Sequence, residues 1–326
     1  MRAISQDTYG DVEVLRVADL PRPTAGPTEV LVEVAAAGLD RGTWHIMRGK
    51  PYLARLALGL RRPKARVPGL DLVGTIVEVG TEVTGWAAGD EVYGIGKGSF
   101  AEYAVADPAK LSRRPAGLRD EQAAVVPVSG LTAWQAVTRA GRVEPGHRVL
   151  VTGASGGVGT YAVQVAAAIG AEVTAVCSAS KAELVRSLGA TRVLDYAAED
   201  VLAHGPYDVI IDIAGNPSNK RLRRALTPNG RAVIVGGETS GALAGGLGRP
   251  IRGSLASVVR RQKIVMFLNR ESGEELVHLT ELIESGRLTP TVDTVFPLEK
   301  VADAMAHLDS GRARGKIAIA VAETRD

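Results

Sequence analysis

The sequence contains a single cysteine, few aromatic residues and no long uninterrupted apolar run. Cys177 stands alone among 326 residues, so the chain can form neither an internal disulfide nor a cysteine-rich zinc cage. The first residues lack the apolar core of a secretory signal, and the longest apolar stretch, residues 158–177, contains Gln164 and Glu172. We therefore expect a cytoplasmic protein that has no membrane partner.

An excess of charge of either sign is also missing. The chain has 39 Lys and Arg against 36 Asp and Glu, a formal net charge of +3. This balance gives no reason to expect a nucleic acid as a partner. Since a single core usually stops growing at about 250–300 residues, the chain is expected to form two domains. Its 38 glycines predict many tight turns.

The two halves of the chain differ in their hydrophobic rhythm. Residues 1–110 contain short β-rich runs such as 29–34 and 74–80, separated by Pro and Gly, and a short helix is expected at 51–60. From about residue 120, predicted strands alternate with predicted helices, which favours parallel β-α-β crossovers and a doubly wound sheet. The predicted strands are 148–152, 172–177, 191–195, 208–213 and 231–235, and the helices are 158–169, 180–188 and 219–226.

The end of the chain has a mixed pattern. It predicts a helix at 274–285, a strand at 291–296, a helix at 299–309 and a strand at 316–321. The glycine-rich stretch 236–253 is expected to be a loop or lid.

A glycine-rich turn follows the predicted strand 148–152. It reads Gly153, Ala154, Ser155, Gly156, Gly157, Val158 and Gly159. Glycines let a backbone turn sharply and approach a pyrophosphate, whose charge then faces free N–H groups at the start of a helix. Because strand, turn and helix occur in this order, the segment predicts a dinucleotide site; the alternative is a purely structural turn.

The segment after the next strand bears on the choice of cofactor. An NAD-binding site would place an acidic residue there to bind the ribose hydroxyls. This chain instead has Ser178, Ser180 and Lys181, which can bind a 2′-phosphate through hydroxyl and ammonium donors. NADPH is therefore the expected cofactor. Alternatively, Ser180 caps a helix starting at Lys181, with Glu183 completing a capping box.

Several motifs in a fixed order cover nearly the whole chain. They are Ala36–Asp40, Pro68–Gly74, Gly89–Tyr93, Gly98–Tyr103, Pro127–Trp134, the glycine turn and Arg314–Lys316. With them the sequence resembles the medium-chain dehydrogenase/reductase superfamily, in particular its zinc-free quinone oxidoreductase branch. The resemblance implies an α/β protein with a GroES-like β-rich catalytic domain, residues 1–122 and 264–326, and a Rossmann NADPH-binding domain, residues 123–263. It also implies an active site between them and a homodimer.

The resemblance assigns roles to individual residues. Thr132 looks like the residue beside the nicotinamide, Tyr196 like an adenosine contact and Lys316 like a phosphate contact. Gly236 and Gly237 end the last strand of the nucleotide domain, where crevices open in such sheets. Two of these residues also have structural alternatives. Thr132 can hydrogen-bond to the backbone of its own helix, and Tyr196 can be a half-buried aromatic residue at a strand end.

Zinc ligands are missing where zinc-dependent relatives have them. Asp40 stands in place of a Cys, Leu70 in place of a His and Asp71 in place of a Glu, so no metal is expected. Without a Lewis acid, a simple ketone is harder to reduce. In a quinone or enone the developing charge spreads over a conjugated system, so such a small-molecule acceptor is the expected substrate.

Three residues near the first motif are candidates for the chemistry. Asp40 is a candidate to donate a hydrogen bond as a neutral acid or to stabilise the pyridinium as an anion, unless it only caps the next turn. His45 is suited to relay a proton, and Trp44 and His45 alternatively line a substrate wall. An alcohol dehydrogenase, a biosynthetic tailoring reductase and a non-catalytic NADPH sensor are the competing hypotheses.

A basic stretch adjoins these residues. Eight Lys and Arg and no acidic residue lie between residues 41 and 66. Such a run is usually a solvated face, but it also suits the attraction of an anionic substrate or of cofactor phosphates.

Overall fold

The computed structural model describes residues 1–215, 217–236, 254 and 261–322. The chain divides into two compact units. Unit 1 consists of Met1–Leu131 and Glu271–Asp326, and unit 2 consists of Thr132–Arg270. The expected fold class, which combines a β-rich part with a parallel sheet, is confirmed.

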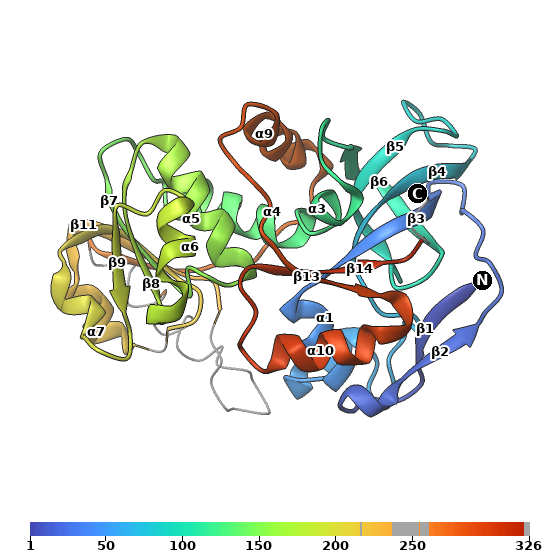
Figure 1. The fold of residues 1–326 in the computed structure, drawn as a ribbon, viewed down its shortest axis with the longest axis horizontal. Coiled ribbons are helices and arrows are strands. Elements are labelled where there is room, and N and C mark those ends of the chain that lie inside the picture. The colour runs from blue at the N-terminus through green and yellow to red at the C-terminus, as the bar shows by residue number, and fades with distance from the viewer. Residues whose placement is uncertain (216, 237–253, 255–260, 323–326) are drawn as a thin grey trace. The chain divides into compact units, whose positions relative to one another are not determined.

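Unit 1 is built on a six-stranded sheet of order β13-β14-β3-β4-β5-β6 (Figure 1). Strand β6 also pairs with β3, so strands β3 to β6 close on themselves. A separate hairpin pairs β1 with β2. The strands are β1 (Arg2–Gln6), β2 (Leu15–Asp19), β3 (Val30–Leu39), β4 (Asp71–Val79), β5 (Glu91–Lys97), β6 (Tyr103–Arg113), β13 (Val292–Pro297) and β14 (Lys316–Ala320).

Helices fill the gaps around this sheet. They are α1 (Arg41–Arg48), α2 (Arg55–Leu58) with the 3-10 turn η2 (Tyr52–Ala54) before it, α3 (Asp120–Ala124), α9 (Gly273–Glu284) and α10 (Val301–Asp309). The last of these packs against β13 and β14 (Figure 1). The short helix expected at 51–60 and the helices expected near the chain end are confirmed, whereas α1 was not expected.

Unit 2 is a parallel sheet of order β12-β11-β10-β7-β8-β9. Its strands are β7 (Arg148–Thr152), β8 (Glu172–Cys177), β9 (Arg192–Asp195), β10 (Tyr207–Asp212), β11 (Leu226–Ile234) and β12 (Lys263–Met266). Alternating strands and helices thus form the predicted doubly wound sheet. The order reverses between β7 and β10, which is where such sheets open a ligand crevice at their carboxyl edge.

The helices of unit 2 follow the predicted pattern. They are α5 (Gly157–Ile169), α6 (Ala182–Ser187) and α7 (Asn219–Arg224), with α4 (Pro127–Gln135) leading from unit 1 into unit 2. Helix α5 packs on β7 and β8, and α6 packs on β9 (Figure 1).

The compact units end later than the predicted boundaries at 122/123 and 263/264. Helix α3 packs against β3 and β4 and therefore belongs to unit 1. Strand β12 hydrogen-bonds to β11 and extends the sheet of unit 2 beyond residue 263. Within the described residues, no helix is long and apolar enough to span a bilayer.

Candidate functional site

The glycine turn connects β7 to α5 as the sequence predicted. Gly153 has φ 65°, a left-handed conformation that favours glycine. Gly156 is the N-cap of α5 and provides no side chain to the first turn, which contains no acidic residue. The first N–H groups of α5 are therefore left for an anion, where the helix dipole also favours negative charge.

Gly159 lets the turn fold back on itself. A Cβ added at this position would lie 2.1 Å from the Gly153 carbonyl oxygen and 2.7 Å from the Ala154 Cα. Only glycine allows the first turn of α5 to pack this closely on the strand-to-helix loop. Ser155 is buried within the loop, while Gly157 and Val158 are partly exposed at the helix start. These residues fit a pyrophosphate.

A buried hydrogen bond joins the two strands that flank the crevice. The Thr152 hydroxyl donates to Asp212 Oδ1 over 3.0 Å and accepts from the Ile213 N–H over 3.0 Å. It holds the carboxyl ends of β7 and β10 together beside the glycine turn. Sequence reasoning missed this pair because its partners lie 60 residues apart and nothing in the local pattern connects them.

The serines after β8 are available to a ligand. The Ser178 and Ser180 hydroxyl oxygens lie 3.3 Å apart in an exposed turn. The alternative that Ser180 caps a helix is wrong, because α6 begins at Ala182 with Lys181 as N-cap and no side-chain capping bond. Nothing in the turn geometry commits these hydroxyls to the helix.

The other predicted cofactor residues of unit 2 lie at the same edge of the sheet. Tyr196 directly follows β9 and is 65% exposed, so the half-buried alternative for its side chain is wrong. Gly236 follows β11, and a Cβ added there would lie 2.2 Å from the Ile213 carbonyl oxygen. Since the strands are parallel, these residues share the carboxyl edge with the glycine turn. Gly237 and most of the predicted lid at 236–253 lie outside the described residues.

Asp40 of unit 1 caps helix α1. Its Oδ1 accepts from the Thr43 N–H over 2.8 Å, and its Oδ2 accepts from the Thr43 hydroxyl over 3.0 Å. Both oxygens are therefore used locally, which matches the capping alternative.

Trp44 and His45 lie on the first turns of the same helix. Their rings meet edge to face, with centroids 5.0 Å apart. The guanidinium of Arg48 lies 4.2 Å from the Trp44 ring centroid and that of Arg41 lies 5.0 Å away, so cation-π contacts hold the indole. Both side chains are partly buried, and the roles of wall and proton relay stay predictions.

Lys316 forms a buried ion pair instead of the predicted phosphate contact. Its side chain is 2% exposed, and Nζ lies 3.2 Å from Oδ2 of Asp71, whose side chain is fully buried. Because the ammonium is enclosed and already bonded, it is not presented to a phosphate. The phosphate contact that the resemblance implied for Lys316 is therefore wrong. The ion pair could not be predicted from local patterns, because its two residues lie 245 positions apart in the sequence.

Three charged residues converge at one end of β3. Gly38 pairs with Asp71 on β4 and with Ala318 on β14, and the chain reaches Asp40 two residues later. Burial raises the pKa of Asp71 to about 7; Lys316 opposes this rise and Asp40 adds to it. Asp71 Oδ1 also accepts from the Val128 N–H at the start of α4, over 2.7 Å. This residue thus joins β4, β14 and α4.

Thr132 lies on α4, and its side chain is 9% exposed. Its predicted position beside the nicotinamide stays a prediction. The described residues contain no cluster of three His, Cys, Asp or Glu side chains arranged to hold a metal ion.

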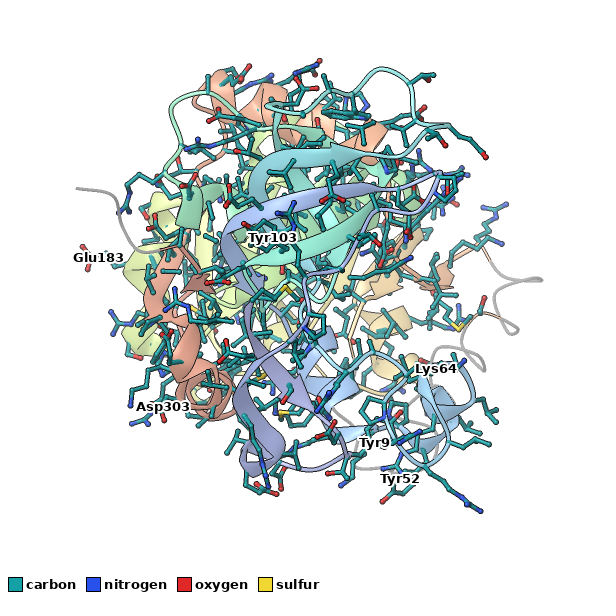
Figure 2. All side chains as sticks on the ribbon, turned by 90° about the vertical axis from the view of Figure 1, so that its right-hand side faces the viewer. Tyr9, Tyr52, Lys64, Tyr103, Glu183 and Asp303 are labelled. Atoms are coloured by element: carbon teal, nitrogen blue, oxygen red, sulfur yellow. The ribbon has the colours of Figure 1, made fainter. Side chains whose placement is uncertain are left out.

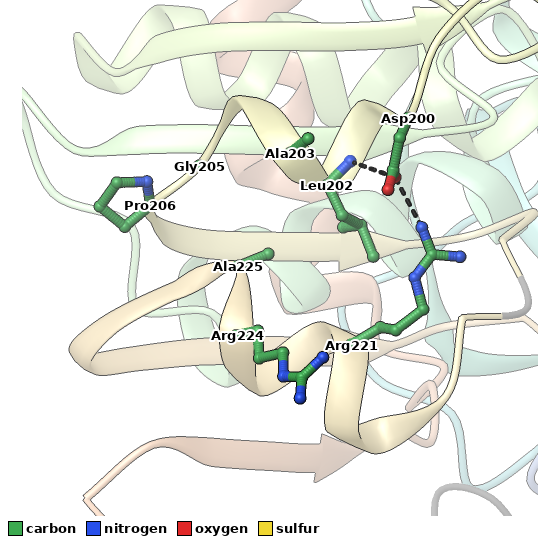
Figure 3. A pocket seen from close by; sticks show the side chains of 8 residues that line it. All are labelled: Asp200, Leu202, Ala203, Gly205, Pro206, Arg221, Arg224 and Ala225. Carbon is green, nitrogen blue, oxygen red and sulfur yellow. Dashed lines mark hydrogen bonds and ion pairs between the residues drawn. The ribbon is translucent and has the colours of Figure 1, made fainter.

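A cavity of about 510 Å³ in unit 2 lies away from these groups. It is bordered by Asp200, Arg221 and Arg224, and Figure 3 shows Asp200 accepting from the Leu202 N–H and from Arg221. Its lining precedes β10 and β11, so the cavity lies at the amino edge of the sheet. The candidate cofactor residues occupy the carboxyl edge.

Each half of the chain contains a match to a protein family. Residues 26–116 match the alcohol dehydrogenase GroES-like domain, and residues 188–319 match the zinc-binding dehydrogenase family. The chloroplast envelope quinone oxidoreductase homolog of Arabidopsis thaliana is 34% identical, with 98% of each chain covered. The mitochondrial NAD(P)H oxidoreductase RTN4IP1 of Bos taurus is 32% identical, covering 97% of this chain and 88% of the relative.

Solved structures agree with this relationship. The quinone oxidoreductase of Coxiella burnetii superimposes with a TM-score of 0.86 at 29% identity, covering 99% of each chain. An NAD-dependent alcohol dehydrogenase superimposes with a TM-score of 0.84 at 31% identity, covering 99% of this chain and 100% of the other.

Proposed function

The chain belongs to the medium-chain dehydrogenase/reductase superfamily as a quinone oxidoreductase-like NAD(P)H oxidoreductase, and we propose that it uses NADPH to reduce a quinone or an α,β-unsaturated carbonyl compound without zinc. The observation that carries this proposal is the carboxyl edge of unit 2. There the tightly folded glycine turn lies beside an acid-free serine and lysine segment.

Different residues at this edge bind different parts of the cofactor. The N–H groups that begin α5 hold the pyrophosphate, and Ser178, Ser180 and Lys181 bind the 2′-phosphate. Tyr196 contacts the adenosine. Thr152 and Asp212 join the carboxyl ends of β7 and β10, which flank the crevice, through their buried hydrogen bond. When bound, NADPH supplies the hydride.

The choice between NADPH and NADH can be tested at Lys181. Lys181→Glu places a negative charge where the 2′-phosphate would lie, so the Kd of NADPH should rise at least tenfold and that of NADH should change little. Arg186→Glu, the same charge reversal on α6, is the matched control. Isothermal titration measures both constants. Equal effects of Lys181→Glu on the two cofactors would remove Lys181 from the 2′-phosphate site.

The proposed acceptor follows from the residues that replace zinc ligands. Asp40, Leu70 and Asp71 provide neither thiolate nor imidazole, and Asp71 is occupied by Lys316. These positions therefore lack the ligands for a zinc ion that would polarise a simple carbonyl group as a Lewis acid. A conjugated acceptor needs only positioning and a few hydrogen bonds, with a proton delivered by His45 or by water.

An NADP-dependent alcohol dehydrogenase is the second candidate, and the similarity to the structure of an NAD-dependent alcohol dehydrogenase favours alcohol oxidation as its reaction. The two candidates separate in one assay series. NADPH oxidation is followed with quinones and enones, and NADP⁺ reduction is followed with primary and secondary alcohols. Turnover confined to alcohols would overturn the proposal. A homodimer and a cytoplasmic location stay predictions from the sequence.

A further inference from the structure

A short segment of unit 1, residues 50–66, combines exposed leucines with positive charge. Leu53, Leu56 and Leu60 are all exposed, Leu56 at 70% and Leu60 at 68%. They lie on η2, on α2 and in the loop that follows. We call residues 50–66 the basic-leucine segment. Isolated surface leucines are common, but three within eight residues concentrate exposed apolar area in one segment, which favours an apolar partner.

The charges of the basic-leucine segment are all positive. It contains six Lys and Arg and no Asp or Glu. Arg66 pairs with Asp7, and Arg55 faces inward. Four other basic residues have no carboxylate partner in the described part of the chain, namely Lys50, Arg61, Arg62 and Lys64. The whole-chain balance of +3 therefore conceals a strongly cationic local surface.

The base of the segment is fixed to unit 1. The Tyr9 hydroxyl donates to the Gly59 carbonyl oxygen over 2.7 Å, and Arg55 Nε donates to the Gly49 carbonyl oxygen over 2.8 Å. The Arg55 guanidinium lies between the rings of Tyr9 and Tyr52. Figure 2 shows Tyr9, Tyr52 and Lys64 in the same region of the surface. These contacts fix the backbone on both sides of α2, so the exposed leucines project from an ordered segment.

We propose that the basic-leucine segment docks on the surface of a bilayer that contains anionic phospholipids. This proposal replaces the expectation of no membrane partner, which rested on the absence of a long apolar run and did not consider this surface. Leucines that enter the headgroup boundary, flanked by Lys and Arg that meet anionic headgroups, are the pattern by which peripheral segments bind membranes. The leucines come from one continuous segment and do not surround a groove. They can therefore insert into a deformable lipid surface more readily than they can enclose a side chain of a protein partner. The proposal concerns this surface alone and does not depend on which acceptor the enzyme reduces.

Vesicle co-sedimentation of the full chain tests the proposal. The probes are vesicles of phosphatidylcholine alone and of equal parts phosphatidylcholine and phosphatidylglycerol. The protein should sediment with the mixed vesicles and stay in the supernatant with the neutral ones. Added salt should weaken the binding, because the electrostatic attraction is screened within a Debye length.

Two matched pairs of variants locate the contact. Leu56→Ser should weaken binding to mixed vesicles about tenfold, whereas Leu268→Ser, at a leucine 74% exposed in unit 2, should leave it unchanged. Replacing Arg61, Arg62 and Lys64 by Gln together should weaken it about a hundredfold. The control replaces Lys220, Arg221 and Arg224 by Gln.

Several outcomes would overturn the proposal. They are no sedimentation with mixed vesicles, equal effects of a variant and its control, and equal binding to neutral vesicles. Thermal unfolding confirms that each variant is folded, as expected for exposed positions. If the triple charge variant instead raises the KM for NADPH and vesicle binding is absent, the segment attracts the cofactor rather than lipid. Stoichiometric binding to a soluble acidic protein without vesicle binding would likewise refute it.

Discussion

The glycine turn of unit 2 and the charge cluster of unit 1 are built in different ways. The turn is a continuous run of seven residues, Gly153 to Gly159, that leads from β7 into the first turn of α5. The cluster consists of side chains, Asp40, Asp71 and Lys316, which the register of β3 brings together from distant positions. The turn depends on glycines that lack a Cβ, and the cluster depends on charged side chains.

This difference decides what each region responds to. The turn should be sensitive to added volume, because its glycines allow contacts that a Cβ would block. The cluster should be sensitive to pH and to the loss of one charge, because buried ions depend on their partners. Variants in the two regions should therefore fail in different ways.

The largest effect is expected from Lys316→Met. It leaves Asp71 fully buried near Asp40 without its cationic partner, so the free energy of unfolding should fall by about 3–5 kcal/mol at pH 8. The loss should shrink at pH 5, because Asp71 can then accept a proton. Denaturant unfolding at both pH values measures it.

The double variant Lys316→Met with Asp71→Asn is the control. It removes the isolated charge, so most of the lost stability should return. A loss in Lys316→Met that is independent of pH would show that packing, and not charge, makes the pair important.

The second prediction concerns the pH dependence of the wild type. Burial raises the pKa of Asp71 from its ordinary value of 3.8 to about 7. Between these values the folded state holds a proton that the unfolded state has released, so stability falls as pH rises. Relative to the double variant, the wild type should lose roughly 1.4 kcal/mol per pH unit in the middle of this window. A difference that is flat from pH 4 to pH 7 would contradict the raised pKa.

The sequence predicted the turn and the alternating strands of unit 2 because both depend on local patterns. Glycine spacing marks the turn, and runs of apolar residues mark strands such as β7 and β8. It did not predict the ion pair between Lys316 and Asp71 or the hydrogen bond from Thr152 to Asp212, because both contacts form only through tertiary packing. Helix α1 was not predicted, because it is only eight residues long and its first turn contains the weak helix formers Gly42 and Thr43.

The turn can be tested by a third prediction. Gly159→Ala places a methyl group 2.1 Å from the Gly153 carbonyl oxygen, so the free energy of unfolding should fall by about 2 kcal/mol and the Kd of NADPH should rise. Gly156→Ala is the matched control, since its nearest contact is 3.4 Å. Calorimetry and titration give both quantities. Equal loss of stability in the two variants would show that the close packing at Gly159 has no special importance.

The smallest effect is expected at Asp40. Asp40→Ala removes the N-cap of α1 and should lower the free energy of unfolding by about 1 kcal/mol, whereas Asp40→Asn keeps the cap. If Asp40 only caps, Asp40→Asn should also keep kcat with NADPH. A large fall in kcat for Asp40→Asn in a fully stable protein would give this carboxylate a direct part in the chemistry.

The most direct test of the proposed function is the loss of reduced-nicotinamide absorbance in a single-turnover reaction. NADPH is prebound to the enzyme, which is treated with a chelator and mixed with a quinone, an enone or a saturated ketone. The absorbance should fall rapidly with the conjugated acceptors and little with the ketone, and the chelator should have no effect. Rapid reduction of the saturated ketone that is abolished by the chelator would contradict the proposed function.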